Sequence, residues 1–252
     1  MTLIDTLKTL EVPLMADGRI DLGETTILLR AVRPYVLAGD KAAVELEALL
    51  KKVRQDGVIT ANESEQIRSK LGEIVYGEMS FSRFVREVRD FPRHGMTYRD
   101  LSAISGTPGI LAAVVDEIGR KLAGVSYDIV VSPEPAGVVF GAAVAARFGK
   151  AFATAALPGR LPGEALTEAR RGIFVNLPLT LATDAVLPGE RVVIIDEVLA
   201  SGGSAAALVR LVERLGGEVK KLVFPVELGG YGARENTLAG YAVDSVITYP
   251  GK

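Results

Sequence analysis

The spacing of apolar and polar residues changes partway along the chain. Up to about residue 78, apolar residues recur three and four positions apart, most clearly in Ile20–Val36 and Ala42–Val53, which predicts amphipathic helices. The helical pattern continues through Phe81–Val88. From Asp90, short apolar runs alternate with helical segments, which is typical of an α/β fold with a parallel sheet. We therefore expect a small all-α domain, residues 1–80, followed by an α/β domain, residues 81–252.

The most informative stretch of the α/β part is VVIIDEVLASGGSA, Val192–Ala205. Its first four residues predict the end of a strand buried on both faces, and two carboxylates, Asp196 and Glu197, follow at once. Small residues then let several backbone N–H groups converge, and the helix predicted after them turns its positive end to the same point. The stretch predicts a phosphate site beside two carboxylates, whose phosphate-binding residues are Ala200, Ser201, Gly202, Gly203 and Ser204.

The acid pair suggests what carries the phosphate. Ionised carboxylates only accept hydrogen bonds, and ribose hydroxyls donate them. The glycines are not followed by the lysine of a P-loop, and the G-x-G-x-x-G of dinucleotide folds is missing here, so ribose 5-phosphate fits best. The other interpretation is a strand, turn and helix whose acids are merely exposed at a strand end.

The same stretch resembles the phosphoribosyl-pyrophosphate (PRPP) signature of type I phosphoribosyltransferases, in which a hydrophobic strand, an acidic pair and a T/S-G-G-T/S loop follow in this order. The resemblance implies the parallel-sheet fold of that family, with Asp196 and Glu197 as catalytic residues. It also implies Mg²⁺ that is bound with PRPP, with no metal ligand supplied directly by the protein.

A second motif, DFPRHGMTYRDL at Asp90–Leu101, places Tyr98 beside Arg99. An aromatic ring next to a guanidinium suits a flat, polar heterocycle, because one stacks and the other donates. Adenine phosphoribosyltransferases begin their fold with a very similar D-F-P-x-x-G-x-x-F-R-D-I/L, and this resemblance implies that Tyr98 and Arg99 form the base site. The alternative is a surface loop in which Asp100 caps the next turn.

The segment SPEPAGVVFG, Ser132–Gly141, follows the first predicted central strand and resembles the family's pyrophosphate loop, G-x-E/D-A/S-R-G-F-x-F-G. An arginine of that loop is replaced here by Ala136, so a cation that would bind diphosphate is missing. Two prolines also remove backbone donors. The predicted loop residues are Glu134, Pro135, Ala136 and Gly137.

A third segment, Gly159–Phe174, is dense in glycine and proline with little apolar periodicity, which predicts a mobile lid. It resembles the family's G-K-L-P-G segment and the residues after it, but the family's preceding R-K is replaced by Ala156 and Leu157, and its lid glutamate by Ile173. We predict Arg160, Glu164 and Glu168 as lid residues. Which of Glu164, Glu168, Arg170 and Arg171 compensates for the replaced residues stays open.

The N-terminal part contains a weak repeat, D-G-x-I-x-x-x-E, in Ala16–Glu24 and Gln55–Glu63. The spacing matches the second half of a calcium-binding EF-hand loop, but the acids of the first half are missing, which argues against calcium. The motif is similar to TerB-like helical domains. We expect capped helices, with Asp21 or Thr60 as the cap and Glu24 or Glu63 in the first turn.

Composition narrows the function further. The chain has 252 residues, 48% of them hydrophobic, with a net charge of −2, so no basic excess indicates a nucleic-acid partner. It has no cysteine and a single histidine, which excludes disulfides and thiolate metal sites and leaves little for a zinc site or a serine triad. The first residues carry acids and no long apolar run, so we expect neither a signal peptide nor a membrane span, and a cytoplasmic location.

Two functional hypotheses follow from the resemblance. The first is an enzyme that forms a purine nucleoside 5′-monophosphate and diphosphate from PRPP and a free base, adenine by resemblance, as a homodimer with an accessory helical domain. The second is a non-catalytic regulatory protein that binds PRPP or a nucleotide and signals through its helices to a protein partner. Turnover of PRPP with a free purine distinguishes them.

Overall fold

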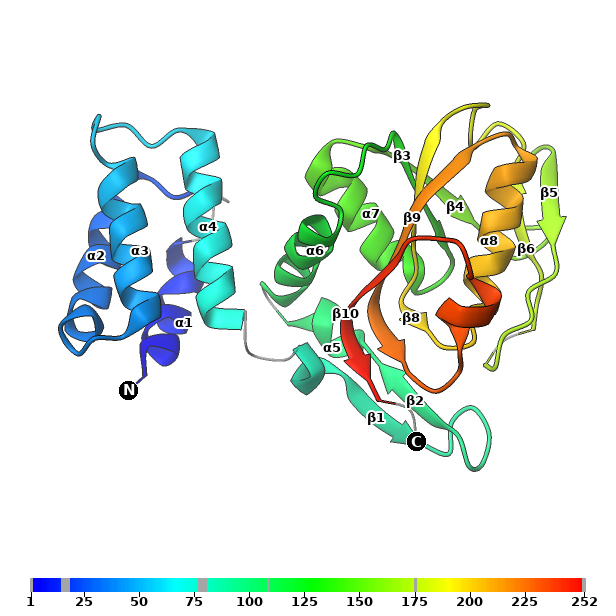
Figure 1. The fold of residues 1–252 in the computed structure, drawn as a ribbon, viewed down its shortest axis with the longest axis horizontal. Helices are drawn as coiled ribbons and strands as arrows, with labels where there is room; N and C mark the ends of the chain where they lie inside the picture. The colour runs from blue at the N-terminus through cyan, green and yellow to red at the C-terminus, as the bar shows by residue number, and fades with distance from the viewer. Residues whose placement is uncertain (1, 15–18, 77–80, 108, 175, 251–252) are drawn as a thin grey trace. The chain divides into compact units, whose positions relative to one another are not determined.

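The computed structural model describes residues 2–14, 19–76, 81–107, 109–174 and 176–250. Its contacts divide the chain into two compact units, Met1–Arg83 and Phe84–Lys252. The first unit is helical and the second has a parallel sheet, as Figure 1 shows. Among the described residues, no helix is both long and apolar enough to cross a lipid bilayer.

The first unit has its apolar stripes turned inward. Leu28, Leu46 and Ile67, which lie on different helices, are all fully buried. Both predicted caps are confirmed. Asp21 and Glu24 form a reciprocal capping box with two 2.8 Å hydrogen bonds, and Thr60 and Glu63 repeat it. Residues 16–18 of the first repeat lie outside the described part. The helices are α1 (Leu3–Leu14), α2 (Leu22–Leu37), α3 (Lys41–Val53) and α4 (Ala61–Tyr76).

The second unit is built on a parallel sheet with the strand order β10-β9-β7-β3-β4, and short β8 pairs with β9. Each of the strands expected from the apolar runs is present, which confirms the α/β class. Because the strands are parallel, their carboxyl ends meet at one edge, where ligands bind in open α/β sheets. The strands are β3 (Ile129–Pro133), β4 (Ala151–Ala155), β7 (Arg191–Ile195), β8 (Val198–Leu199), β9 (Glu218–Leu228) and β10 (Val243–Tyr249).

Helices cover both faces of this sheet. Ile194 and Phe224 belong to the core cluster that also holds buried residues of α8, such as Leu208. Val193 and Val223, which alternate with them, are equally buried and point to the other face, where α6 and α7 pack (Figure 1). The helices are α5 (Ser102–Gly106), α6 (Ile110–Lys121), α7 (Gly137–Phe148) and α8 (Gly203–Arg214), with a short π-helical turn at Ala233–Thr237.

Two antiparallel hairpins are added to the sheet, β1 (Arg86–Arg89) with β2 (Thr97–Asp100), and β5 (Ala165–Glu168) with β6 (Leu179–Ala182). The first corrects an expectation. Helical structure was predicted through Phe81–Val88, but only a single 3₁₀ turn forms at Phe81–Phe84 before the chain becomes a strand. Cross-strand pairing with β2 overrides the local helical spacing.

Candidate functional site

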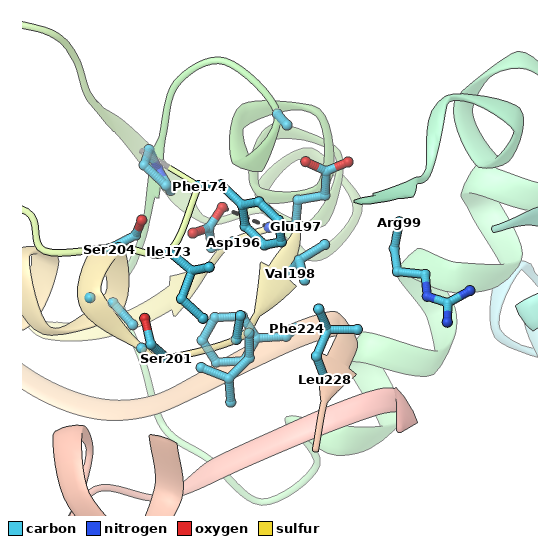
Figure 2. Close-up of a pocket in the computed structure, with 18 of the residues that line it drawn as sticks. Arg99, Ile173, Phe174, Asp196, Glu197, Val198, Ser201, Ser204, Phe224 and Leu228 are labelled. Carbon is cyan, nitrogen blue, oxygen red and sulfur yellow. Dashed lines mark hydrogen bonds between the residues drawn. The ribbon is translucent and has the colours of Figure 1, made fainter. Parts of the chain in front are cut away.

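A cavity of about 350 Å³ opens at the carboxyl ends of β3, β7 and β9. It lies wholly within the second unit. Its lining draws on segments that are far apart in the sequence: the hairpin before the sheet, the loop after β3, the predicted lid and the loop between β7 and α8 (Figure 2). The tertiary structure thus brings the separate sequence motifs to a single cavity.

The acid pair lies on the cavity wall, immediately after β7. The backbone N–H of Glu197 donates to Asp196 Oδ1 at 2.7 Å, which orients the Asp196 carboxylate (Figure 2). Burial raises the pKa of Asp196 to about 6, against the opposing effects of that N–H and of Arg170. Burial, together with the charges of Asp196 and Asp100, raises the pKa of Glu197 to about 7. Two carboxylates that share one site therefore ionise only near neutral pH.

Gly137 brings the loop after β3 against this pair. A Cβ atom at Gly137 would lie 2.9 Å from Asp196 Oδ1 and 2.6 Å from the Pro133 ring, closer than side-chain atoms normally approach. Only glycine allows helix α7 to begin this close to the Asp196 carboxylate. The segment predicted as the pyrophosphate loop and the acid pair are therefore neighbours in space.

The loop Ala200–Ser204 turns into helix α8, whose N-cap is Gly202. The first bond of the helix runs from the Ala206 N–H to the Gly202 carbonyl, 2.9 Å away. The N–H groups of the three residues between them therefore have no acceptor within the helix, and the helix dipole adds positive potential there. The Ser201 and Ser204 side chains lie at the same cavity (Figure 2). This is the geometry of an anion site, and we call Ala200–Ser204 the cradle.

The predicted lid segment, residues 159–174, lies directly on the cradle. A Cβ atom at Gly203 would be 1.9 Å from the carbonyl oxygen of Arg171 and 2.9 Å from the nitrogen of Gly172. Backbone therefore packs on backbone here, and a side chain at position 203 has no room.

Aromatic rings line the cavity beside the acid pair. Tyr98 lies between Phe91 and Phe174, with edge-to-face contacts at ring-centroid distances of 5.4 and 5.7 Å. Burial and the nearby Glu197 carboxylate raise the pKa of Tyr98 to about 12, so the phenol stays protonated. Sequence reasoning identified Tyr98 but missed both phenylalanines. They are 83 positions apart in the sequence and only the fold brings them together.

Arg99 also borders the cavity, but its guanidinium is bound elsewhere. Its Nη1 donates to Glu87 at 2.7 Å, and its Cζ lies 4.3 Å from the centroid of the Tyr249 ring. In Figure 2 the guanidinium points away from Asp196 and Glu197. The guanidinium thus braces hairpin β1–β2 against β10, and its predicted role at a base stays a prediction.

The loop after β3 lines the cavity with Pro133, Glu134, Pro135 and Ala136. Glu134 is already engaged, because its Oε1 accepts from the Leu157 N–H at 2.8 Å. Ala136 contributes only a methyl group at the position where the resembling loop has an arginine.

The three predicted lid residues lie apart from the cavity lining. Arg160 is largely exposed, with its Nη1 3.6 Å from Glu134. Glu164 is exposed, and its carbonyl accepts from Thr183. Glu168 binds both Arg210 and Arg214 of α8, at 2.8 and 2.6 Å, which lowers its pKa. Glu168 thus anchors the lid segment to α8, the helix that follows the cradle.

Arg170 is the charged lid side chain that reaches the cavity, where Ile173 and Phe174 of the same segment also line the wall. It is only 7% exposed, and its Nε donates to the Leu177 carbonyl at 2.9 Å. Burial lowers its pKa, an effect that the charge of Asp196 opposes. The sequence made Arg170 one of four candidates that could compensate for the replaced lid residues. Nothing in the sequence favoured Arg170 over the other three.

The donor chemistry of the site suits a hard divalent cation that arrives with its substrate. Among the described residues, no three His, Cys, Asp or Glu side chains cluster as a metal cage. Asp196 and Glu197 nevertheless offer carboxylate oxygens at the cavity, and Mg²⁺ prefers such ligands together with water and substrate phosphates.

Comparison with known proteins agrees with this geometry. Residues 107–238 match the family model of the phosphoribosyl transferase domain. An adenine phosphoribosyltransferase from Lachnoclostridium phytofermentans is 37% identical over 169 residues, which are 67% of this chain and 97% of that protein. The crystal structure of adenine phosphoribosyltransferase from Thermoanaerobacter pseudethanolicus superposes with a TM-score of 0.65 at 34% identity, covering 67% of this chain and 98% of that one.

The Giardia lamblia enzyme, solved in complex with 9-deazaadenine, has a TM-score of 0.63 at 27% identity and covers 68% of this chain and 98% of that one. The family match includes β3, the lid, the acid pair and the cradle. The motif resemblance, the parallel sheet and the single cavity agree with these matches, and the chain belongs to the type I phosphoribosyltransferase family.

Proposed function

We propose that this protein is an adenine-type purine phosphoribosyltransferase, which forms AMP and diphosphate from PRPP and adenine. The observation that carries this assignment is the similarity, at 37% identity across 97% of its length, to a protein named as that enzyme. The cavity supports it, because an anion cradle, two carboxylates and an aromatic wall line the same space. These three parts suit the phosphate, the ribose and the base of one product.

In the reaction, a ring nitrogen of adenine forms a bond to ribose C1 and loses its proton. The bond from C1 to the diphosphate oxygen breaks, and its electron pair leaves with diphosphate. The sugar becomes oxocarbenium-like on the way, so catalysis requires alignment of the base and stabilisation of the departing charge.

Each part of the chain has a role in that alignment. The cradle and the dipole of α8 hold the 5′-phosphate. Asp196 and Glu197 accept hydrogen bonds from the ribose hydroxyls, most strongly when the two carboxylates are ionised. The ring of Phe174 stacks on the base, Tyr98 supports that ring by its edge-to-face contact, and the lid excludes water.

Mg²⁺ that enters with PRPP would bind diphosphate and ribose oxygens beside Asp196 and Glu197, and would neutralise part of the departing charge. We propose no ligand set supplied by the protein alone. Ala136, Ala156 and Leu157 contribute no cation, which lowers the protein's own share of this stabilisation. The loss of one such donor typically costs about two to three decades of rate.

Other parts of the assignment stay proposals. We propose a homodimer in the cytoplasm, with residues 1–80 as an accessory domain and residues 81–252 as the transferase domain. We also propose that the helical domain is TerB-like, a likeness supported by two capping boxes at equivalent places of its repeat.

Turnover with free purines tests the proposed function. The protein is incubated with PRPP, Mg²⁺ and adenine, guanine or hypoxanthine, and diphosphate release is followed. We expect release with adenine, at a rate at least about tenfold above that with the other bases, because recognition by hydrogen bonding at the base edge discriminates strongly. PRPP binding without turnover of any base would support the regulatory alternative instead.

Truncation of Phe174 tests the aromatic wall. We expect Phe174→Ala to raise the KM for adenine about tenfold, since stacking on an aromatic ring is worth about 1–3 kcal/mol per base, and to leave the KM for PRPP within about twofold. Steady-state kinetics with each substrate varied in turn provide the measurement. Tyr231→Ala, which truncates a 49% exposed aromatic ring outside the cavity lining, is the matched control. Equal changes in both KM values would contradict stacking on the base.

A further inference from the structure

We propose that Arg170 binds the diphosphate of PRPP from the lid segment, and so replaces the cation that the loop after β3 lacks at Ala136. This inference rests on the proposed function and deepens it. It assigns the leaving-group cation to a residue that the family motifs do not mark.

The first argument is the state of the guanidinium. Arg170 is 93% buried and lines the cavity, yet no carboxylate of the described residues lies within the 4.0 Å of an ion pair with it. Its Nε is bonded to the Leu177 carbonyl, while its terminal nitrogens have no acceptor in the part of the chain that the structure describes. A buried cation with unused donors at a substrate cavity is suited to an anionic ligand.

The second argument is the lack of another suitable cation. Arg99 also lines the cavity, but Glu87 and the Tyr249 ring already hold its guanidinium. Arg160 keeps the charge of the family's G-K-L-P-G segment, but its side chain is 64% exposed. Arg160 is outside the cavity lining, and its guanidinium lies near the carboxylate of Glu134. Among the described cavity-lining residues, Arg170 is therefore the cation available to a phosphate group.

The third argument is position. The Arg170 guanidinium is close enough to Asp196 for its charge to matter, and Asp196 is the proposed partner of the ribose hydroxyls. The diphosphate leaves from the ribose carbon next to those hydroxyls. The lid backbone immediately after Arg170 is packed on Gly203, which fixes Arg170 next to the cradle.

Ligands that carry different phosphate groups test the assignment. Binding of PRPP, ribose 5-phosphate and inorganic diphosphate, each with Mg²⁺, is measured by calorimetry for the full-length protein and for Arg170→Gln and Arg170→Lys. The control is Arg120→Gln, which removes the same charge from an exposed position of α6 outside the cavity lining. We expect Arg170→Gln to weaken PRPP and diphosphate binding about 10- to 100-fold, with ribose 5-phosphate within about twofold. Arg170→Lys should keep part of the affinity, and the control all of it.

Three results would overturn the proposal. Equal losses for PRPP and ribose 5-phosphate would assign Arg170 to the 5′-phosphate, and unchanged binding of all three ligands would make it a structural residue. A loss for PRPP alone, with unchanged diphosphate binding, would indicate an effect on the sugar through Asp196. If Arg170→Gln does not fold, Arg170→Lys decides, because it keeps the charge and alters the geometry. Wild-type protein that binds neither PRPP nor ribose 5-phosphate would instead refute the proposed function.

Discussion

Replacing Asp196 with Asn is expected to lower kcat/KM for PRPP about 100- to 1000-fold. The variant keeps the shape of the residue and its acceptor for the Glu197 N–H, but loses the charge that strengthens hydrogen bonds from two ribose hydroxyls and the attraction for Mg²⁺. Steady-state kinetics and calorimetry with PRPP measure the loss. Asp184→Asn, an exposed acid outside the cavity lining, is the matched control. A variant with unchanged PRPP affinity would refute the proposed role of Asp196.

The same variant should alter the pH dependence of binding. Wild-type affinity for PRPP is expected to fall roughly 30- to 100-fold between pH 7.5 and 5.5, because the tightly binding form has both carboxyl groups ionised and their pKa values are about 6 and 7. PRPP titrates in this range as well, but its contribution is common to both proteins and cancels in the comparison. In Asp196→Asn only Glu197 remains to ionise, so the variant should show the shallower dependence. Parallel curves for the two proteins would contradict the assignment.

The stability of the ligand-free protein should respond with the opposite sign. The pKa of Asp196 is raised on folding from 3.8 to about 6, so the folded state holds its proton more tightly than the unfolded state. The resulting stabilisation is complete below about pH 4 and is lost as the pH rises through 6. Asp196→Asn is therefore expected to be about 2–3 kcal/mol more stable than wild type at pH 8, relative to the difference at pH 4. Denaturant unfolding at the two pH values provides the measurement.

Replacing Gly203 with Ala is expected to have an effect of comparable size for a steric reason. The added methyl group would meet the Arg171 carbonyl oxygen at 1.9 Å, so either the lid or the cradle must move. Misplacement by about 1 Å commonly costs about 100-fold in rate, and we expect at least that loss in kcat/KM. Steady-state kinetics and thermal unfolding provide the measurements.

The matched control for Gly203→Ala is Gly72→Ala in α4, where a methyl group meets no atom within 4 Å. There alanine should stabilise the helix by about 0.5–1 kcal/mol, because it restricts the unfolded chain. Position 203 lies in the first turn of α8, so helix propensity alone predicts that Gly203→Ala also stabilises the folded protein. A Gly203→Ala enzyme that is more stable than wild type and fully active would contradict the lid–cradle contact.

Local pattern predicted the parallel sheet well, because β3 and β7 are buried on both faces along most of their length and so carry short apolar runs. The motif that runs from Val192–Ile195 through Asp196 and Glu197 to the cradle could also be predicted. Its strand end, turn and helix start are adjacent in the chain, so local pattern is enough to identify them. The capping boxes of the first unit are equally local. The strand Arg86–Arg89 was missed because its partner, β2, decides its conformation.

The sequence by itself therefore determined the fold class, the small-residue turn into α8 and the position of the acid pair after β7, which depend on neighbouring residues. Only the tertiary structure decided that Arg99 is held by Glu87 and Tyr249, that Phe174 joins Tyr98, and that Arg170 enters the cavity while Glu168 turns to α8. Each of these outcomes depends on charges or rings that are distant in the chain. Their interaction energies exist only after the lid and hairpin have packed onto the sheet, so no local spacing predicts them.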